Sequence, residues 1–167
     1  MNARIVQISV SRGGVPKTAV PTAMVTAEGL EGDAQRDREH HGGPERAVCL
    51  YSIEAIEHLR AEGHPIAPGN IGENVTVQGL DWSAIAPGDH LLLGDRVLVQ
   101  VTRYTSPCVN IRGSFKEGEF ARVSHKRHPG WSRVYARVLV EGTISRDDPV
   151  RRLDEIRAAE LTAAASR

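Results

Sequence analysis

The most regular feature of the chain is a series of short stretches rich in valine, isoleucine and leucine, separated by turns with glycine, proline or aspartate. Apolar stretches of this length, alternating or continuous, predict β-strands. The predicted strands span residues 4–10, 23–27, 46–51, 74–77, 90–93, 97–104 and 133–140. The stretch at 46–51 is almost continuously apolar, so we expect it to be buried on both faces. Residues 94–96 predict a hairpin turn between two of these strands.

Helical patterns are fewer. Ser52 is a typical N-cap residue, and Ile53, Ile56 and Leu59 form the apolar face of a helix that ends at Gly63. Residues 113–127 are highly charged and predict a helical or irregular excursion between strands.

These patterns together predict a mostly-β protein, folded as a closed β-barrel with a few peripheral helices. The 167 residues suit a single domain over residues 1–150, and the spacing of apolar residues predicts a C-terminal helix with a fraying tail over residues 151–167. No internal repeat or interdomain linker interrupts this organisation.

Charge and cysteine content narrow the classes of function. Lys plus Arg and Asp plus Glu each total 21, so nothing favours non-specific binding to nucleic acid or to anionic membranes. Two distant cysteines form no disulfide framework and no zinc pattern, and they suit a reducing compartment. The N-terminal residues lack the apolar core of a secretory signal, and no apolar run approaches the roughly 20 residues that span a bilayer. We therefore expect a cytoplasmic protein that binds neither nucleic acid nor a membrane.

Cys108 is the candidate for chemistry that the strand pattern places best. It follows the strand at 97–104 after Thr105, Ser106 and Pro107. Proline cannot donate a ladder hydrogen bond, so Pro107 ends the strand or lies at its edge and presents the next side chain at the rim. A thiolate there serves as a nucleophile, a persulfide carrier or a soft metal ligand. The alternative is a small buried apolar residue, which is also the interpretation we favour for Cys49 within its apolar strand.

Two loops gather further polar candidates. The loop between the second and third predicted strands combines charge, glycine and imidazole, and its backbone N–H groups and guanidinium groups suit an anion. Its candidate residues are Asp33, Arg36, Arg38, His41, Gly42, Gly43 and Arg46. In the second loop, at 68–74, Glu73 and Asn74 either orient a ligand or satisfy the turn itself. The alternative for the first loop is a solvated segment whose charges neutralise one another.

Other residues carry weaker signals. Lys17 follows a glycine-rich turn, where it meets an anion or lies on the surface. A basic stretch over residues 125–133 rims an anionic pocket or forms a solvated face. Adjacent His40 and His41 point in opposite directions on an extended chain, so a zinc site that joins both of them to Cys108 has no usual ligand spacing.

Taken in order, these segments resemble the MOSC domain, the module named for its occurrence at the C-terminus of molybdenum-cofactor sulfurases. The resemblance covers nearly the whole chain and depends on many motifs in a fixed order. They are Val15-Pro16-Lys17, Gly29-Leu30-Glu31-Gly32-Asp33, His40-His41-Gly42-Gly43-Pro44-Glu45-Arg46-Ala47-Val48, Gly69-Asn70-Ile71-Gly72-Glu73-Asn74-Val75-Thr76, Pro87-Gly88-Asp89, Ser106-Pro107-Cys108, Gly130-Trp131 and Gly142-Thr143-Ile144.

The resemblance implies a β-barrel of the kind also found in pyruvate kinase, and a pterin-based molybdenum cofactor whose metal Cys108 ligates. Thiolate and dithiolene sulfur suit a soft metal, and the cofactor's phosphate suits glycine-rich loops and cations. The residues that we expect to hold the cofactor are Lys17, Asp33, Arg36, Arg38, His41, Gly42, Gly43, Arg46, Glu73, Asn74, Arg103 and Ser106.

The first functional hypothesis is therefore a reductase of small N-hydroxylated compounds, similar to the hydroxylaminopurine-detoxifying proteins, which takes electrons from a separate donor. One other cysteine besides Cys108 is too few for an iron–sulfur cluster. The second hypothesis is a sulfur carrier that holds a persulfide on Cys108 and receives sulfur from a cysteine desulfurase. A pyridoxal phosphate site, associated with the family, would then lie on that partner. The third is a non-catalytic module that binds the cofactor.

Overall fold

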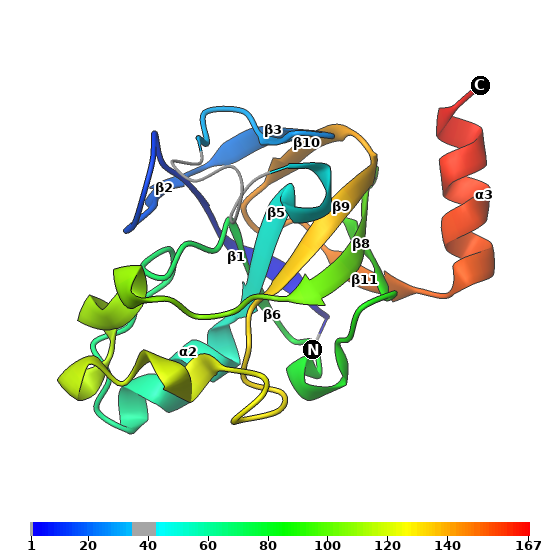
Figure 1. Ribbon diagram of the computed structural model, residues 1–167. Coiled ribbons are helices and arrows are strands. Elements are labelled where there is room, and N and C mark those ends of the chain that lie inside the picture. The colour runs from blue at the N-terminus through cyan, green and yellow to red at the C-terminus, as the bar shows by residue number, and fades with distance from the viewer. Residues whose placement is uncertain (1, 35–42) are drawn as a thin grey trace.

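The computed structural model describes residues 2–34 and 43–167, and it consists mainly of short strands (Figure 1). The strands are β1 (Arg4–Val10), β2 (Thr18–Val20), β3 (Thr22–Thr26), β4 (Gly29–Leu30), β5 (Val48–Ser52), β6 (Val75–Gln78), β7 (His90–Leu93), β8 (Val97–Tyr104), β9 (Val134–Val140), β10 (Gly142–Ser145) and β11 (Val150–Leu153). The bounds of β1 and β8 are those that the apolar pattern predicts, and the predicted hairpin joins β7 to β8.

The strands form two open sheets. Eight of them lie in the order β11-β7-β8-β9-β5-β6-β1-β2, and the order β10-β3-β4 forms a separate three-stranded sheet. Most neighbouring strands are antiparallel, but β5 and β6 run parallel, so the larger sheet is mixed. This parallel pair is joined by a long crossover that contains the helix α2 (Ile53–Ala61) and the loop at 68–74, as a parallel connection requires.

The prediction of a closed β-barrel is wrong, although the mostly-β content with few helices is confirmed. The larger sheet ends at β11 on one side and β2 on the other, and within the described residues these two strands do not pair. β1 meets the segment before β11 in one isolated bridge, between Arg4 and Pro149. Backbone hydrogen bonds flank this bridge, from Val150 N to Ala3 O at 3.0 Å and from Ile5 N to Asp148 O at 2.8 Å, but the contact involves only the start of β1 and does not join the two outer strands. The apolar pattern identifies strands, but it contains no information on whether the outer strands meet.

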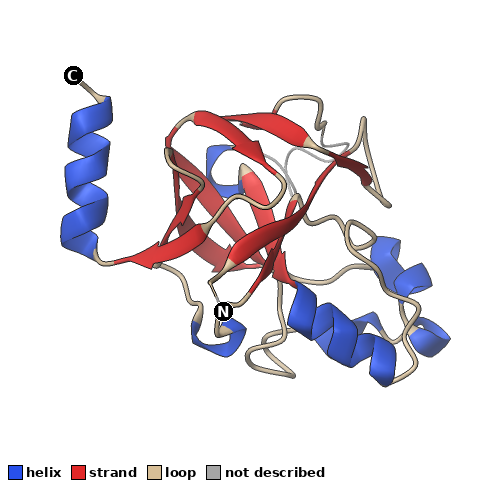
Figure 2. Cartoon of the chain, turned by 180° about the vertical axis from the view of Figure 1, so that it is seen from behind, coloured by secondary structure: helices blue, strands red, loops and turns tan. Residues whose placement is uncertain are grey.

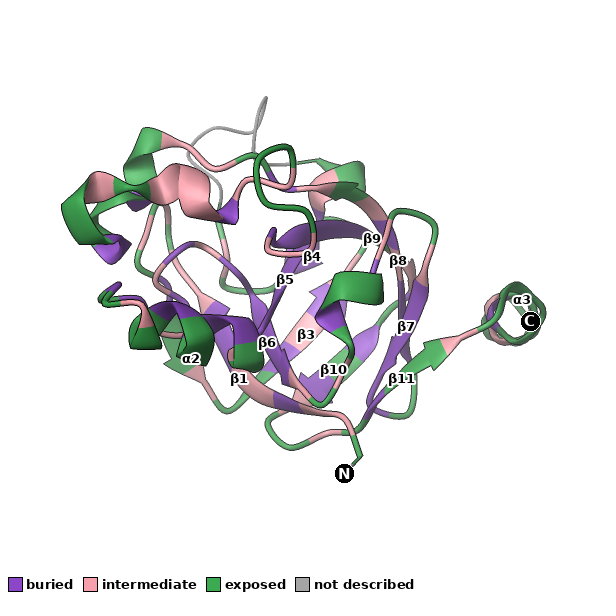
Figure 3. Cartoon of the chain, turned by 90° about the horizontal axis from the view of Figure 1, so that it is seen from below, coloured by how far each residue is buried: buried purple, intermediate pink, exposed green. Residues whose placement is uncertain are grey.

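The core lies between the strands and is almost entirely aliphatic. All five residues of β5 are buried, which confirms the expected burial for residues 48–51, while Arg46, at the start of the predicted strand, is half-buried and precedes β5. β5 lies between β9 and β6 in the sheet, and it continues the buried band that Figure 3 shows across the strands. Cys49 is a part of this buried strand, which matters for the site described below.

Helices occupy the ends of the sheet. α2 begins as predicted, with the Ser52 hydroxyl accepting a hydrogen bond from Ala55 N at 3.2 Å. The charged excursion consists of short 3-10 turns, η3 (Val109–Ser114), η4 (Lys116–Gly118) and η5 (Phe120–Val123), and further turns are η1 (Pro44–Arg46) and η2 (Trp82–Ala84). α3 (Glu155–Ala165) lies at one side of the molecule (Figure 2) and packs Ala158 against Leu98 of β8 and Val140 of β9. None of the helices in the described ranges is long and apolar enough to cross a membrane.

Two glycines test how the 68–74 loop is held against β1. Gly69 and Gly88 both have positive φ, +85° and +98°, so Gly→Ala at either costs about 1–2 kcal/mol in backbone strain. A Cβ at Gly69 would also lie 2.7 Å from Lys17 O, whereas one at Gly88 would meet nothing within 4 Å. We expect Gly69→Ala to lower the free energy of unfolding in urea well beyond the loss caused by the matched control, Gly88→Ala. Equal losses would contradict this account of the loop.

Candidate functional site

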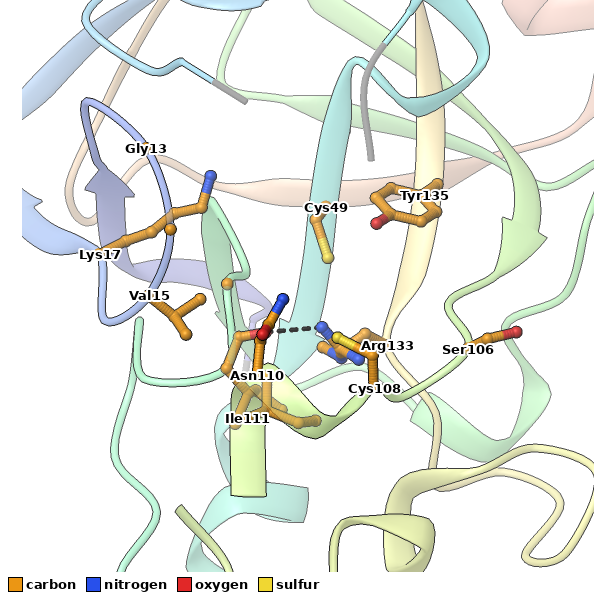
Figure 4. A pocket seen from close by; sticks show the side chains of 13 residues that line it. Gly13, Val15, Lys17, Cys49, Ser106, Cys108, Asn110, Ile111, Arg133 and Tyr135 are labelled. Carbon is orange, nitrogen blue, oxygen red and sulfur yellow. Dashed lines mark hydrogen bonds between the residues drawn. The ribbon is translucent and has the colours of Figure 1, made fainter. Parts of the chain in front are cut away.

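A pocket of about 290 Å³ opens at the end of the larger sheet where β8 and β9 meet β5 (Figure 4). Its walls come from four parts of the chain: the turn after β1, β5 with the loop at 68–74, the segment after β8, and β9. The volume is at the lower end of the range typical of small-molecule sites. The pocket brings together both cysteines of the chain and two cations.

Cys108 lies at the rim of this pocket, as its position after a strand predicts. β8 ends at Tyr104, and an irregular segment leads to Cys108, which is the residue before η3. Its side chain is partly exposed and lines the pocket together with Ser106 and Asn110. The thiol is therefore accessible to a ligand from solvent and is fixed on one side by η3, whose Ile111 N donates to Cys108 O at 3.1 Å.

Cys49 lies deeper in the same pocket. Its sulfur, on the buried strand β5, lies 3.9 Å from Thr105 Oγ1 and points into the cavity (Figure 4). Burial raises the pKa of the Cys49 thiol, and the Arg133 charge opposes this rise. Cys49 is thus a neutral thiol at physiological pH. The expectation of an apolar core residue holds for its burial, but the cysteine also forms part of the pocket wall.

A buried polar network supports the wall opposite Cys108. The Lys17 ammonium binds both carboxylate oxygens of Asp33 at 2.8 Å, and both side chains are 5% exposed. Asn74 donates to Asp33 Oδ2 at 2.9 Å and to Ser9 O at 3.2 Å, and it accepts from Cys49 N at 3.0 Å. Because the Asp33 carboxylate balances its charge at contact distance, Lys17 contributes little net charge to the pocket.

Arg133 is the second cation of the pocket, and its charge is less balanced. The residue is 5% exposed, and its Nη1 donates to Ile71 O at 2.6 Å. Its Nε is buried and has no hydrogen-bond partner among the described residues. A buried donor without a partner costs free energy, and the positive charge of a guanidinium that lines a pocket favours an anionic ligand there. Arg133 is therefore the strongest candidate here for holding a negatively charged group.

Glu73 is the acidic group buried near Arg133. It is fully buried, and this desolvation raises its pKa to about 7, while its own backbone N–H, the Arg133 charge and the backbone N–H groups of Gly69 and Ile71 oppose the rise. Those N–H groups face the carboxyl group, but within the described chain neither oxygen has a hydrogen-bond partner of normal geometry. Because the carboxyl is partly protonated at neutral pH, it cancels the Arg133 charge incompletely.

Tyr135 completes the pocket on the β9 side. It is the register partner of Cys49, and Figure 4 shows its oxygen turned inwards. Burial, with smaller contributions from Cys49 and Cys108, raises the pKa of Tyr135. The phenol therefore keeps its proton at neutral pH and can donate a hydrogen bond to a ligand.

The structure brings together some of the predicted site residues and separates others. Lys17, Ser106 and Cys108 line the pocket, while Asp33 and Asn74 lie behind its wall. Glu73 is buried beside it, and its backbone loop rather than its carboxyl group forms the wall. Their roles toward a cofactor stay predictions.

Other predicted residues lie elsewhere. Gly43 and Arg103 are exposed and outside the lining, and the Arg46 guanidinium lies 5.9 Å from the centre of the Tyr135 ring. Arg36, Arg38, His41 and Gly42, together with His40, lie outside the described residues.

Sequence reasoning assigned Cys49 to the core and left Tyr135 out of the site. Arg133 belonged to the basic stretch that we considered as the rim of an anionic pocket, and this one member lines it. A fully apolar strand gives no signal of which residue faces a cavity, because both faces are equally hydrophobic.

Comparisons with known proteins agree on one family. The pattern that defines the MOSC domain matches residues 37–151. The uncharacterized protein YflK of Bacillus subtilis is 34% identical over 137 residues, covering 81% of this chain and 61% of YflK. YiiM of Escherichia coli is 33% identical over 151 residues, covering 85% of this chain and 65% of YiiM. A Gibberella moniliformis protein named a reductase is 31% identical over 134 residues, 77% of this chain but 23% of that protein. The chain thus spans less than two thirds of each of these relatives.

A solved structure supports the same assignment. The crystal structure of YiiM from Geobacillus stearothermophilus superposes with a TM-score of 0.69 at 26% identity, covering 91% of this chain and 75% of that chain.

The raised pKa of Glu73 predicts a pH-dependent stability. A carboxyl with a pKa of about 7 when folded and near 4.5 when unfolded stabilises the fold fully below pH 4.5. This contribution is lost as the pH rises through 7. In the wild-type chain, we expect Glu73 to lower the free energy of unfolding by about 1–3 kcal/mol as the pH rises from 5 to 8. In Glu73→Gln this decrease should be absent. Urea unfolding at both pH values measures it, with exposed Glu57→Gln as the control. The same fall in both variants would contradict the assignment.

Proposed function

Because the chain belongs to the MOSC domain family, we propose that it binds a pterin-type molybdenum cofactor through Cys108 and reduces small N-hydroxylated compounds in the pocket beside it. The family is associated with the molybdenum cofactor, and one relative bears the name of a reductase. The substrate class and the role of each residue are parts of this proposal.

The observation that carries the proposal is the meeting of Cys108 and Arg133 in one pocket. A partly exposed thiol supplies the soft ligand that molybdenum prefers. The Arg133 guanidinium, which lines the pocket, supplies a positive charge for an anionic group such as the cofactor's phosphate. A thiol and an unsatisfied cation suit a ligand that is soft at one end and anionic at the other.

Other residues of the pocket determine how closely a ligand can approach its walls. Gly13 and Gly14 in the turn after β1 have positive φ values of 142° and 81°, and their lack of side chains lets a ligand approach the backbone closely. A Cβ on Gly72 would lie 3.2 Å from Val15 Cγ1, so glycine keeps this part of the wall open. Lys17, held by Asp33, fixes the turn in place more than it attracts an anion.

The reaction requires two electrons and two protons, because an N–OH group becomes N–H with release of water. When bound, the cofactor supplies the two-electron redox change. Tyr135 keeps its phenolic proton and is positioned at the wall to donate a hydrogen bond to the hydroxyl oxygen of the substrate. The electrons come from a separate donor. That the protein lies in the cytoplasm stays a prediction.

Molybdenum content tests the binding site. Purified from a host that makes the cofactor, the chain should carry about one molybdenum, and Cys108→Ala should lose it. Arg133→Gln should bind the cofactor about 10–100-fold more weakly, because a charge-assisted hydrogen bond is worth about 1.5–3 kcal/mol. Elemental analysis after dialysis measures both, with Arg151→Gln on the exposed face of β11 as the control. A wild-type chain without molybdenum would contradict the proposal. Urea unfolding shows whether each variant folds.

Turnover is a separate prediction. The molybdenum-loaded chain should reduce hydroxylaminopurine to the amine with a chemical electron donor, and Tyr135→Phe should lower kcat about 10–100-fold through loss of the hydroxyl donor. Chromatography of the product measures the rate. If the chain lacks metal and mass spectrometry instead finds one added sulfur on Cys108 after treatment with a cysteine desulfurase, the sulfur-carrier hypothesis replaces the reductase.

A further inference from the structure

The pocket holds both cysteines of the chain, although they are far apart in sequence. The proposed function uses Cys108 alone and gives the second thiol no role. Cys49 is buried at 3% exposure, yet its sulfur belongs to the pocket wall, so the two thiols face a common space.

The order of the strands explains why they meet. β9 lies between β8 and β5, and its Tyr135 is the register partner of both Arg103 on β8 and Cys49 on β5. β8 ends one residue later, and Thr105 then donates its N–H to Arg133 O at 2.9 Å. The Thr105 hydroxyl lies 3.9 Å from the Cys49 sulfur. Cys108 follows Thr105 by three residues and turns back toward the same cavity (Figure 4).

The two cysteines differ in how their backbones are held. Cys49 is paired on both sides, by β9 and by the Asn74 side chain that accepts its N–H. Cys108 lies outside the sheet, at the end of the irregular segment that begins at Thr105. The backbone of Cys49 is therefore held by the sheet, whereas that of Cys108 lies between the irregular segment and η3.

From this geometry we propose that Cys49 and Cys108 are a redox pair that closes to an intramolecular disulfide when the chain meets a hydroperoxide. The modification site does not depend on the proposed function, because it needs two thiols and no cofactor. Its consequence does: a disulfide occupies the sulfur that would ligate molybdenum, so oxidation would block loading of the cofactor reversibly.

The chemistry balances in two steps. The more exposed Cys108 thiolate attacks one peroxide oxygen, the O–O bond breaks, and Cys108 becomes a sulfenic acid while the second oxygen leaves as water after taking a proton. The Cys49 sulfur then attacks the Cys108 sulfur and loses its proton, and the hydroxyl group leaves as a second water. Two electrons pass from the two thiols to one hydrogen peroxide, with no further reductant or metal.

The test treats the purified full-length chain, free of cofactor, with hydrogen peroxide and counts thiols after denaturation. We expect both thiols to disappear together and dithiothreitol to restore both. Mass spectrometry should find one pair of peptides linked between residues 49 and 108, with two hydrogen atoms fewer than the separate peptides. The chain should stay monomeric on a non-reducing gel. Cys49→Ser and Cys108→Ser should form no intramolecular link, and in Cys49→Ser the remaining Cys108 should become over-oxidised or join two chains.

Two results would overturn the proposal. In one, the wild-type chain gains oxygen on Cys108 while the Cys49 thiol remains free. In the other, the disulfide joins different chains. Both are read from the wild-type chain, so they hold even if a serine variant folds poorly. A chain that forms the disulfide but never binds molybdenum would reject the proposed function alone, whereas a molybdenum-binding chain without the disulfide would reject this inference alone.

Discussion

The buried ion pair of Lys17 with Asp33 is the interaction on which the pocket depends. Two charges at 5% exposure are costly to bury, and removing either partner from such a pair typically costs about 3–5 kcal/mol. Asn74 extends the pair to the backbones of β1 and β5 through Ser9 O and Cys49 N. The turn after β1, the loop at 68–74 and the strand that bears Cys49 are thereby tied to one another. The same arrangement requires glycine at position 69, because the loop passes so close to Lys17 O there that a side chain would clash.

This pairing decides which cation of the pocket is available to a ligand. Lys17 is held at 2.8 Å by both oxygens of a carboxylate, so its field beyond the pair is weak. Arg133 has a carbonyl partner and the Glu73 carboxyl nearby, and burial raises the pKa of that carboxyl to about 7. As pH falls below 7, Glu73 gains its proton and the positive charge of Arg133 becomes less compensated. On the acidic side of neutrality, the Glu73 carboxyl therefore offsets less of the Arg133 charge, and its protonation also stabilises the fold.

The sequence predicted local structure better than it predicted the arrangement of the site. Alternating apolar residues identified β1, and Pro107 correctly marked the end of β8 ahead of Cys108. The prediction of a closed barrel was wrong because closure depends on whether distant edges of the sheet meet, and here β1 meets the segment before β11 in one isolated bridge. Lys17 and Asp33 were expected to hold a cofactor, and a sequence cannot show that they satisfy each other. Tyr135 escaped notice because a strand residue becomes a site residue through its neighbours on adjacent strands, which only the sheet order defines.

The same sheet order explains why a cysteine that is buried as predicted also lines the pocket. An apolar strand between two others predicts inert core, and Cys49 is indeed buried. β9, however, places the end of β8 beside β5, so the chain after Tyr104 crosses the end of the strand that holds Cys49. A thiol that the sheet holds still then faces one that follows an irregular segment. The proposed disulfide depends on this difference, since a peroxide would reach the more exposed sulfur of Cys108 first and the buried sulfur of Cys49 would then be its partner.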